Sequence, residues 1–96
     1  SFGQSSGIIK NIAMADLFIK VRDYERAIEH CDIILAKEPD NAEILSYKSL
    51  AFAATEKMTD AVELAQKAIG INPFLQGFLL WIVISVSSLF AILHLL

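Results

Sequence analysis

The chain contains little of what catalytic sites and nucleic-acid-binding surfaces are made from. Its 96 residues include one cysteine and two histidines, which exclude an internal disulfide and give no metal-ligand spacing. Its four glycines form no phosphate-binding loop. It has eight basic and eleven acidic residues, a net charge of −3, and no basic cluster that could neutralise a row of phosphates. We therefore expect no catalytic residue, no metal, no other cofactor, no small-molecule substrate and no nucleic-acid partner.

The cysteine and the histidines are better explained as structural residues. His30 and Cys31 are adjacent, and adjacent helical residues point about 100° apart, so they do not form a nucleophile–base pair. We predict His30 on the outer face of its helix and Cys31 on the inner face, as a buried and unreactive thiol. His94 lies near the other end of the chain and is too distant to share a site with His30.

Charged side chains are absent from residues 74–96. A helix of about 20 apolar residues spans the ~30 Å hydrocarbon core of a bilayer, so we predict a single transmembrane anchor. Because Trp81 favours the membrane interface, the apolar core starts either near Ile82 or, with Trp81 buried against another subunit, at Phe74 or Leu75. The predicted anchor residues are Leu79, Leu80, Trp81, Ile82, Val83, Ile84, Val86, Leu89, Phe90, Ile92 and Leu93.

A repeat with a period of 34 residues precedes this segment. Aligning Ala27 with Ala61 also aligns Pro39 with Pro73, and one offset shared by two landmarks indicates a structural repeat. Apolar residues at helical spacing predict two helices in each repeat. Proline ends each repeat, and Gly70 is expected in the left-handed conformation at the end of the last helix. The four helices are predicted over residues 8–20, 24–37, 42–54 and 60–69.

The chain therefore divides into segments of different character. Residues 1–7 are rich in Gly and Ser and are predicted to be a flexible lead. Two repeats follow, and residues 74–96 form the anchor helix. Extending the repeat register places Leu79, Ile82, Val83 and Val86 at core positions of a third repeat, so this last segment can begin as a helix that caps the stack. The start at Ser1 leaves open a processed chain or a fragment. The predicted repeats comprise residues 8–41 and 42–73.

Small residues occupy matching positions of the two repeats: Ala15, Ala27, Ser49 and Ala61. Large apolar or aromatic residues surround them, although Asn11 and Lys48 depart from that pattern. With the terminal prolines, this pattern resembles the tetratricopeptide repeat (TPR) family, and the resemblance implies that the small residues lie where the two helices of each repeat cross. The resemblance implies an all-α fold, a fragment of a right-handed α-solenoid with TPR-like helix–turn–helix repeats, followed here by a single transmembrane helix.

The resemblance also implies a protein-binding groove lined by the first helix of each repeat. Chaperone-binding members hold a carboxylate at positions that are Ile12, Asp16 and Tyr47 in this chain, and these residues are unsuited to that ligand. A peptide or amphipathic helix with basic residues fits better, although the same apolar residues can instead pack against the tail or a neighbouring subunit. The expected groove residues are Ile9, Ile12, Asp16, Ile19, Glu43, Ser46, Leu50 and Ala53.

Two functions follow from these features. The first is a membrane-anchored TPR adaptor or scaffold that mediates protein–protein interaction at a membrane surface. The alternative is a small single-pass structural subunit of a large membrane complex, such as a respiratory, photosynthetic or transport assembly. In both, lipid and other transmembrane helices would contact the anchor. The repeats would lie in the cytosol, at either the endoplasmic reticulum or the mitochondrial outer membrane.

Overall fold

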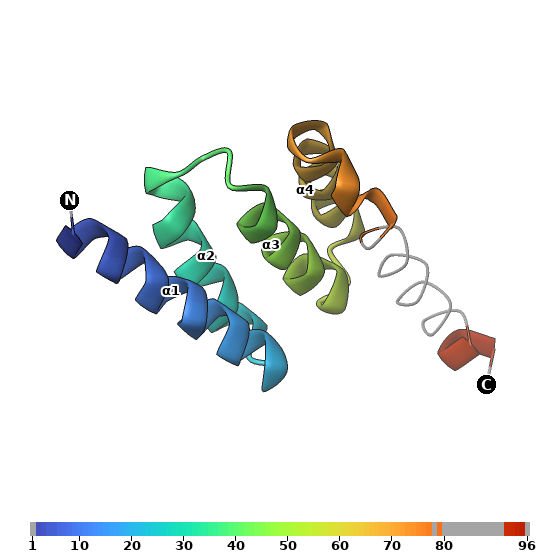
Figure 1. The fold of residues 1–96 in the computed structure, drawn as a ribbon. Helices are drawn as coiled ribbons and strands as arrows, with labels where there is room; N and C mark the ends of the chain where they lie inside the picture. Colours follow the sequence, from blue (N-terminus) through green and yellow to red (C-terminus); the bar gives the residue numbers. More distant parts are fainter. Residues whose placement is uncertain (1, 78, 80–91, 96) are drawn as a thin grey trace.

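The computed structural model describes residues 2–77, 79 and 92–95 of the chain. Four α-helices lie side by side in the order of the sequence (Figure 1), and each helix packs on the next. A 3₁₀ turn, η1, follows the fourth helix. The all-α class predicted from the sequence is confirmed for these residues. The elements are α1 (Phe2–Lys20), α2 (Tyr24–Lys37), α3 (Ala42–Ala54), α4 (Met58–Ile71) and η1 (Pro73–Leu75).

Left-handed residues and side-chain caps define the connections between the helices. Arg22 and Glu56 have φ angles of 63° and 69°, a region that L-residues other than Asn and Asp rarely adopt. Asp23 caps α2 by accepting a hydrogen bond from the Arg26 amide at 3.3 Å, and Asn41 caps α3 by accepting from the Ile44 amide at 3.1 Å. Both caps satisfy amides that lack a partner within the helix.

The small residues at the helix crossings are buried, as the repeat pattern predicts. Ala15, Ala27 and Ala61 are fully buried, and Ser49 is 2% exposed. The Ser49 hydroxyl donates a hydrogen bond to the Ala61 carbonyl at 2.7 Å, which joins α3 to α4 directly. A larger side chain at any of these four positions would push the two backbones apart.

The core consists of two clusters of buried side chains. The first joins the first three helices and is extended by half-buried Leu35 and Tyr47. The second joins α3 and α4 to Leu79, which lies beyond η1 and is only 1% exposed. The clusters comprise Ala15, Cys31, Ile34 and Ile44, and Leu45, Ala65, Ala68 and Leu79.

Some helix boundaries differ from the sequence predictions. Helix α1 begins at Phe2 and so includes residues that were predicted to be a flexible lead. Helix α4 begins at Met58 rather than Asp60, with no side-chain cap, because the left-handed residue Glu56 ends the turn early. Gly70 lies within α4 and has no positive φ. The helix ends instead before Pro73, which has no amide to continue it.

The predicted anchor lies mostly outside the described residues. Among the residues that the structure describes, no helix combines the length and the apolarity needed to cross a bilayer. Leu79 packs in the second cluster, at the core position that the 34-residue register gives it. Ile92 and Leu93 are exposed. The other predicted anchor residues lie outside the described part of the chain: Leu80, Trp81, Ile82, Val83, Ile84, Val86, Leu89 and Phe90.

Candidate protein-binding surface

The predicted groove residues lie on α1 and α3, and they differ widely in exposure. Ser46 and Ala53 are buried, and the Ser46 hydroxyl donates to the Glu43 carbonyl at 2.6 Å, so these two side chains offer no surface to a partner. Ile12 is half-buried and packs against the first core cluster. The remaining five are at least partly accessible: Ile9, Asp16, Ile19, Glu43 and Leu50.

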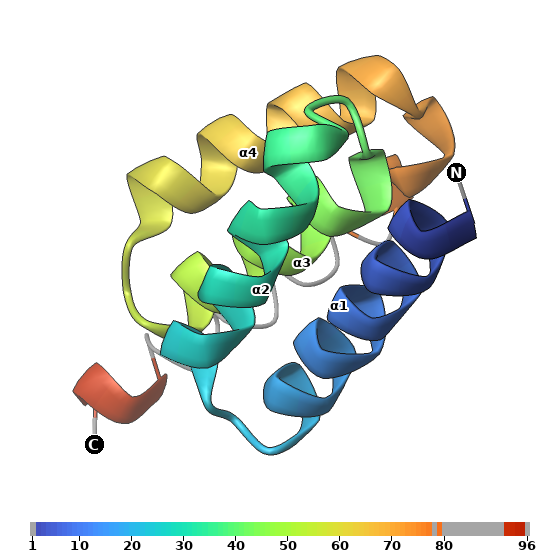
Figure 2. The same cartoon turned by 90° about the vertical axis from the view of Figure 1, so that its left-hand side faces the viewer.

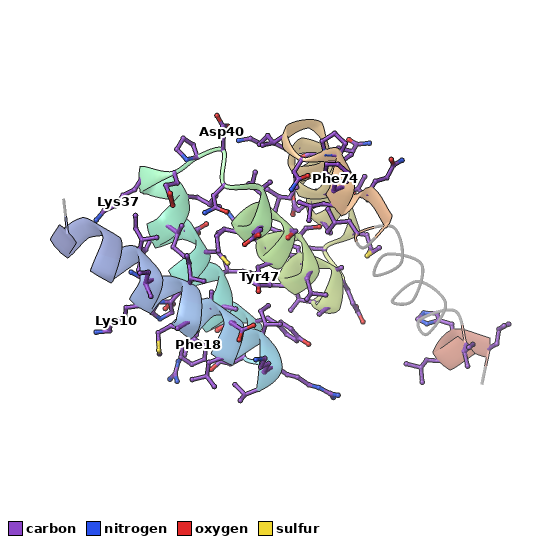
Figure 3. All side chains as sticks on the ribbon, viewed as in Figure 1. Lys10, Phe18, Lys37, Asp40, Tyr47 and Phe74 are labelled. Carbon is purple, nitrogen blue, oxygen red and sulfur yellow. The ribbon has the colours of Figure 1, made fainter. Side chains whose placement is uncertain are left out.

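Polar groups from the two helices gather around Tyr47. The pKa of the Tyr47 phenol is raised, first by burial and then by the negative charges of Asp16 and Glu43, while Lys20 lowers it. Lys20 Nζ lies 2.8 Å from Asp16 Oδ2, and this contact raises the pKa of the exposed lysine. Tyr47 is carried by α3 (Figure 3), and charges on α1 contribute to the shift of its phenol pKa.

We call this surface the α1–α3 face. It has polar side chains from both helices and half-buried aliphatic side chains such as Ile12 and Leu50. It carries two carboxylates and one ammonium group, and the ammonium is already paired with Asp16. A bound cation would therefore be attracted to Glu43 and to the Tyr47 oxygen. The face comprises Ile12, Asp16, Ile19, Lys20, Glu43, Tyr47 and Leu50.

Cys31 has neither the access nor the ionisation of a nucleophile. It is fully buried in the first cluster, and burial raises the pKa of its thiol to about 11, so the reactive thiolate is scarce near neutral pH. Within residues 2–77, 79 and 92–95, no three His, Cys, Asp or Glu side chains are arranged to hold a metal ion.

His30 does not lie where the sequence placed it. Its ring faces α1 rather than the outer surface: Nδ1 is 2.8 Å from Asn11 Oδ1, and the ring stacks on Phe18 at 5.4 Å between centroids. The prediction of an outer position was wrong because Asn11, a departure from the repeat pattern, supplies a hydrogen-bond partner between the helices.

Sequence reasoning missed Lys20 as a member of the α1–α3 face, and it named Tyr47 only as a groove position unsuited to a carboxylate. Lys20 follows Asp16 by four residues, and this spacing is the available signal for their ion pair. Tyr47 was considered as a mismatched carboxylate ligand, although its position beside the groove residue Ser46 placed it near the same surface.

The comparison with protein-family models decides the family. The tetratricopeptide repeat model matches residues 12–75, which is two thirds of the chain. The chain belongs to the tetratricopeptide repeat family. No curated protein and no solved structure gives a match. The matched region of this TPR protein contains α2, α3, α4 and η1, together with the part of α1 from residue 12 onward. TPR repeats generally bind other proteins and are generally not catalytic.

Proposed function

We propose that this TPR protein is an adaptor that binds an amphipathic helix or peptide on its α1–α3 face while its C-terminal segment holds it at a membrane. The gathering of Asp16, Lys20 and Glu43 around Tyr47 carries the binding part of this proposal. Tyrosine is enriched at protein interfaces, and the accessible aliphatic side chains on the same two helices offer apolar area to a partner.

The charge of the face favours a partner with a basic residue. Asp16 and Glu43 outnumber Lys20, and an opposite charge on the partner would complete the network around Tyr47. A carboxylate at the same place would meet two like charges. The partner's apolar residues would lie on Ile12 and Leu50, which are half-buried in the free chain.

The absence of charged residues in 74–96 supports membrane attachment. Since Leu79 is part of the repeat core, the span would start after it, which leaves residues 80–96. These 17 residues are at the lower limit for a transmembrane helix. The repeats would then be held close to the bilayer, on the cytosolic side of the endoplasmic reticulum or the mitochondrial outer membrane.

The second candidate function is a structural subunit of a larger membrane complex. The exposed aliphatic side chains of Ile9, Leu17 and Val21, which are 65%, 49% and 59% exposed, favour it, because permanent subunits often cover such surfaces. In that role the α1–α3 face would be covered at all times.

Purification of the full chain from native membranes in mild detergent tests the two functions. A substoichiometric partner that dissociates in salt supports the adaptor. A fixed, equimolar and salt-resistant set of partners contradicts the adaptor and supports the subunit.

Charge reversal tests the face itself. We expect Asp16→Lys with Glu43→Lys to release the partner. Glu29→Lys with Glu63→Lys makes the same change in net charge at exposed positions on α2 and α4 and should retain it. Equal release by both pairs would show that net charge, not the face, holds the partner.

Alkaline extraction tests membrane attachment independently. The full chain should stay in the membrane pellet, and a chain that ends at Leu79 should move to the supernatant. If the full chain is itself extracted, membrane attachment by the C-terminal segment is excluded, whatever the partner experiment gives.

A further inference from the structure

The two second helices, α2 and α4, end in different kinds of side chain. The 34-residue offset pairs Lys37 with Ile71 and Asp40 with Phe74, and Figure 3 labels three of these four residues. All four side chains are exposed, Ile71 by 42% and Phe74 by 95%. Charged residues are expected at such positions, whereas the phenyl ring of Phe74 leaves nearly all of its apolar surface in water. The second repeat therefore has apolar side chains at exposed positions where the first repeat has charges.

The loss of charge extends over the whole connection but not over the whole helix. The four charged residues of segment 37–43 all have uncharged counterparts in segment 71–77, since Glu38 pairs with Asn72 and Glu43 with Gly77. Further back on the same helices the exchange is reversed, because Ile33 of α2 is Lys67 in α4. The apolar character therefore belongs to the end of α4 and the turn after it, not to α4 as such.

The geometry of η1 holds Phe74 away from the core. Asn72 Oδ1 accepts a hydrogen bond from the Phe74 amide at 3.1 Å, which fixes the start of the turn. Leu75 packs against the second core cluster, and neighbouring residues of a 3₁₀ turn point about 120° apart. The exposure of Phe74 is thus set by the fold. We call Ile71, Pro73 and Phe74 the η1 patch.

The η1 patch lies close to the place where the C-terminal segment leaves the stack. Leu79 is buried in the second cluster and follows Phe74 by five residues, which can span at most about 18 Å. Residues 80–96 come directly after it and contain no charged side chain. If that segment enters a bilayer, the bilayer surface is within reach of the patch.

We propose that the η1 patch is a lipid-contact surface, with Phe74 and Ile71 in the interfacial layer of the bilayer that holds the C-terminal segment. The inference rests on the membrane attachment proposed above, and it adds which end of the helix stack faces the bilayer. Apolar side chains are stabilised at the boundary between headgroups and acyl chains. No residue of segment 68–77 is charged, so no charge has to leave water there.

The size of the η1 patch favours lipid over a second protein. Each partner contributes roughly 800 Å² to a standard protein–protein interface, whereas one large aromatic side chain buries about 150–250 Å². Three side chains are too few for a stable dimer or a stable complex. A lipid contact needs no such area, because the C-terminal segment supplies the attachment and the patch only orients the repeats.

Tryptophan fluorescence of the full chain in vesicles tests the proposal. All variants carry Trp81→Phe, which removes the chain's one tryptophan. Phe74→Trp and Ile71→Trp are the probes, and Asp40→Trp and Lys37→Trp are their controls at the same register positions. Each variant is reconstituted in phosphatidylcholine vesicles with and without bromine on the acyl chains, which quenches nearby tryptophan. We expect the probes to emit at shorter wavelength and to be quenched several-fold more strongly than the controls. Circular dichroism checks that each variant retains its helices.

Flotation of the vesicles separates failure of this inference from failure of membrane attachment. If the chain floats with the vesicles but bromine quenches Phe74→Trp no more than Asp40→Trp, the patch does not contact lipid and membrane attachment still stands. A shift to shorter wavelength in Phe74→Trp without quenching also overturns the inference, because a second copy of the chain then covers the patch. If the chain does not float, membrane attachment is excluded and the inference is excluded with it.

Discussion

The first helix pair, α1 with α2, and the second pair, α3 with α4, are held together by different kinds of contact at the same register position. In the first pair Asn11 and His30 join α1 to α2 by a hydrogen bond of 2.8 Å. The 34-residue offset pairs these residues with Leu45 and Leu64, and both leucines belong to the apolar packing of the second cluster. The repeat therefore fixes which positions lie between the helices, but it leaves open whether they are joined by polar or apolar contacts.

The two ends of the stack also differ. Helix α4 is followed by η1 and by Leu79, which is buried in the second cluster. On helix α1, which lies at the edge of the stack (Figure 2), the side chains of Ile9 and Leu17 are 65% and 49% exposed. A helix stack buries each element only against its neighbours, so among the described residues α4 has an apolar side chain packed on it by the segment that follows, while α1 carries exposed aliphatic side chains.

The largest expected effect comes from Leu79, which covers the C-terminal end. Leu79→Ala removes a side chain that is 1% exposed and leaves a cavity beside Leu45 and Ala68, so it should lower the free energy of unfolding by about 2–5 kcal/mol. Leu17→Ala is the control: Leu17 is 49% exposed, and its truncation should change stability by about 0.5 kcal/mol or less. Urea unfolding followed by circular dichroism measures both. Similar losses would mean that the two ends do not differ in this way.

The position of Leu79 shows how far the sequence could predict the fold. The resemblance to the TPR family predicted the buried crossings correctly, and the offset set by Ala27 and Ala61 gave Leu79 a core position. In both cases burial follows from register, which is a property of backbone spacing. The start of α1 at Phe2 and the continuation of α4 through Gly70 were missed, because Gly and Ser only disfavour helix weakly and neighbouring turns can extend through them.

The candidate surface could be predicted only in part. The sequence placed Asp16 and Glu43 on the inner helices, and the structure brings both near Tyr47. The sequence could not show that Ser46 and Ala53 are buried, because burial there depends on how the helices pack rather than on spacing along one helix. The orientation of His30 depends on its hydrogen bond to Asn11 and its stacking on Phe18, which a period of 34 does not predict.

The second prediction concerns Cys31, whose register position in the second pair is occupied by Ala65. The pKa of the Cys31 thiol is raised from 9.0 to about 11 by burial. The unfolded chain releases the thiol proton near pH 9 while the folded chain keeps it, so stability is constant below pH 9 and falls as the pH rises from 9 to 11. The slope is at most about 1.4 kcal/mol per pH unit, and the total loss should be about 2 kcal/mol.

Cys31→Ala reproduces the second pair and supplies the control for this prediction. The variant should be about 1 kcal/mol less stable at pH 8, since a small buried group is lost, but its stability should fall less steeply between pH 9 and 11. Tyr47, whose pKa is also raised, keeps some of the slope in both proteins. Urea unfolding at pH 8, 9, 10 and 11 measures the difference, and identical slopes would exclude Cys31 as its source.

The third prediction replaces the polar contact between α1 and α2 with apolar side chains, like those at the matching position between α3 and α4. Asn11→Leu alone leaves the half-buried His30 without its partner and should lower stability by about 1 kcal/mol. Asn11→Leu with His30→Leu should recover most of that loss, because neither residue then lacks a hydrogen bond. A double-mutant cycle, with His30→Leu as the other single variant, measures the coupling. Additive losses would show that the 2.8 Å contact contributes no coupling energy.

The smallest expected effect concerns the contact between the two pairs. Lys48 Nζ lies 2.7 Å from Asp32 Oδ1, and the side chains are 21% and 53% exposed. The matching residue of α1 is Met14, so Lys48→Met makes the two first helices alike at this position and should lower stability by about 0.5 kcal/mol. Because Asp32 is accessible to solvent, salt screens the pair, and the difference between the variant and the wild type should shrink as ionic strength rises. A difference that salt does not change would instead indicate that the lysine acts through its packing on Phe52, whose ring centroid is 5.7 Å from Lys48 Nζ.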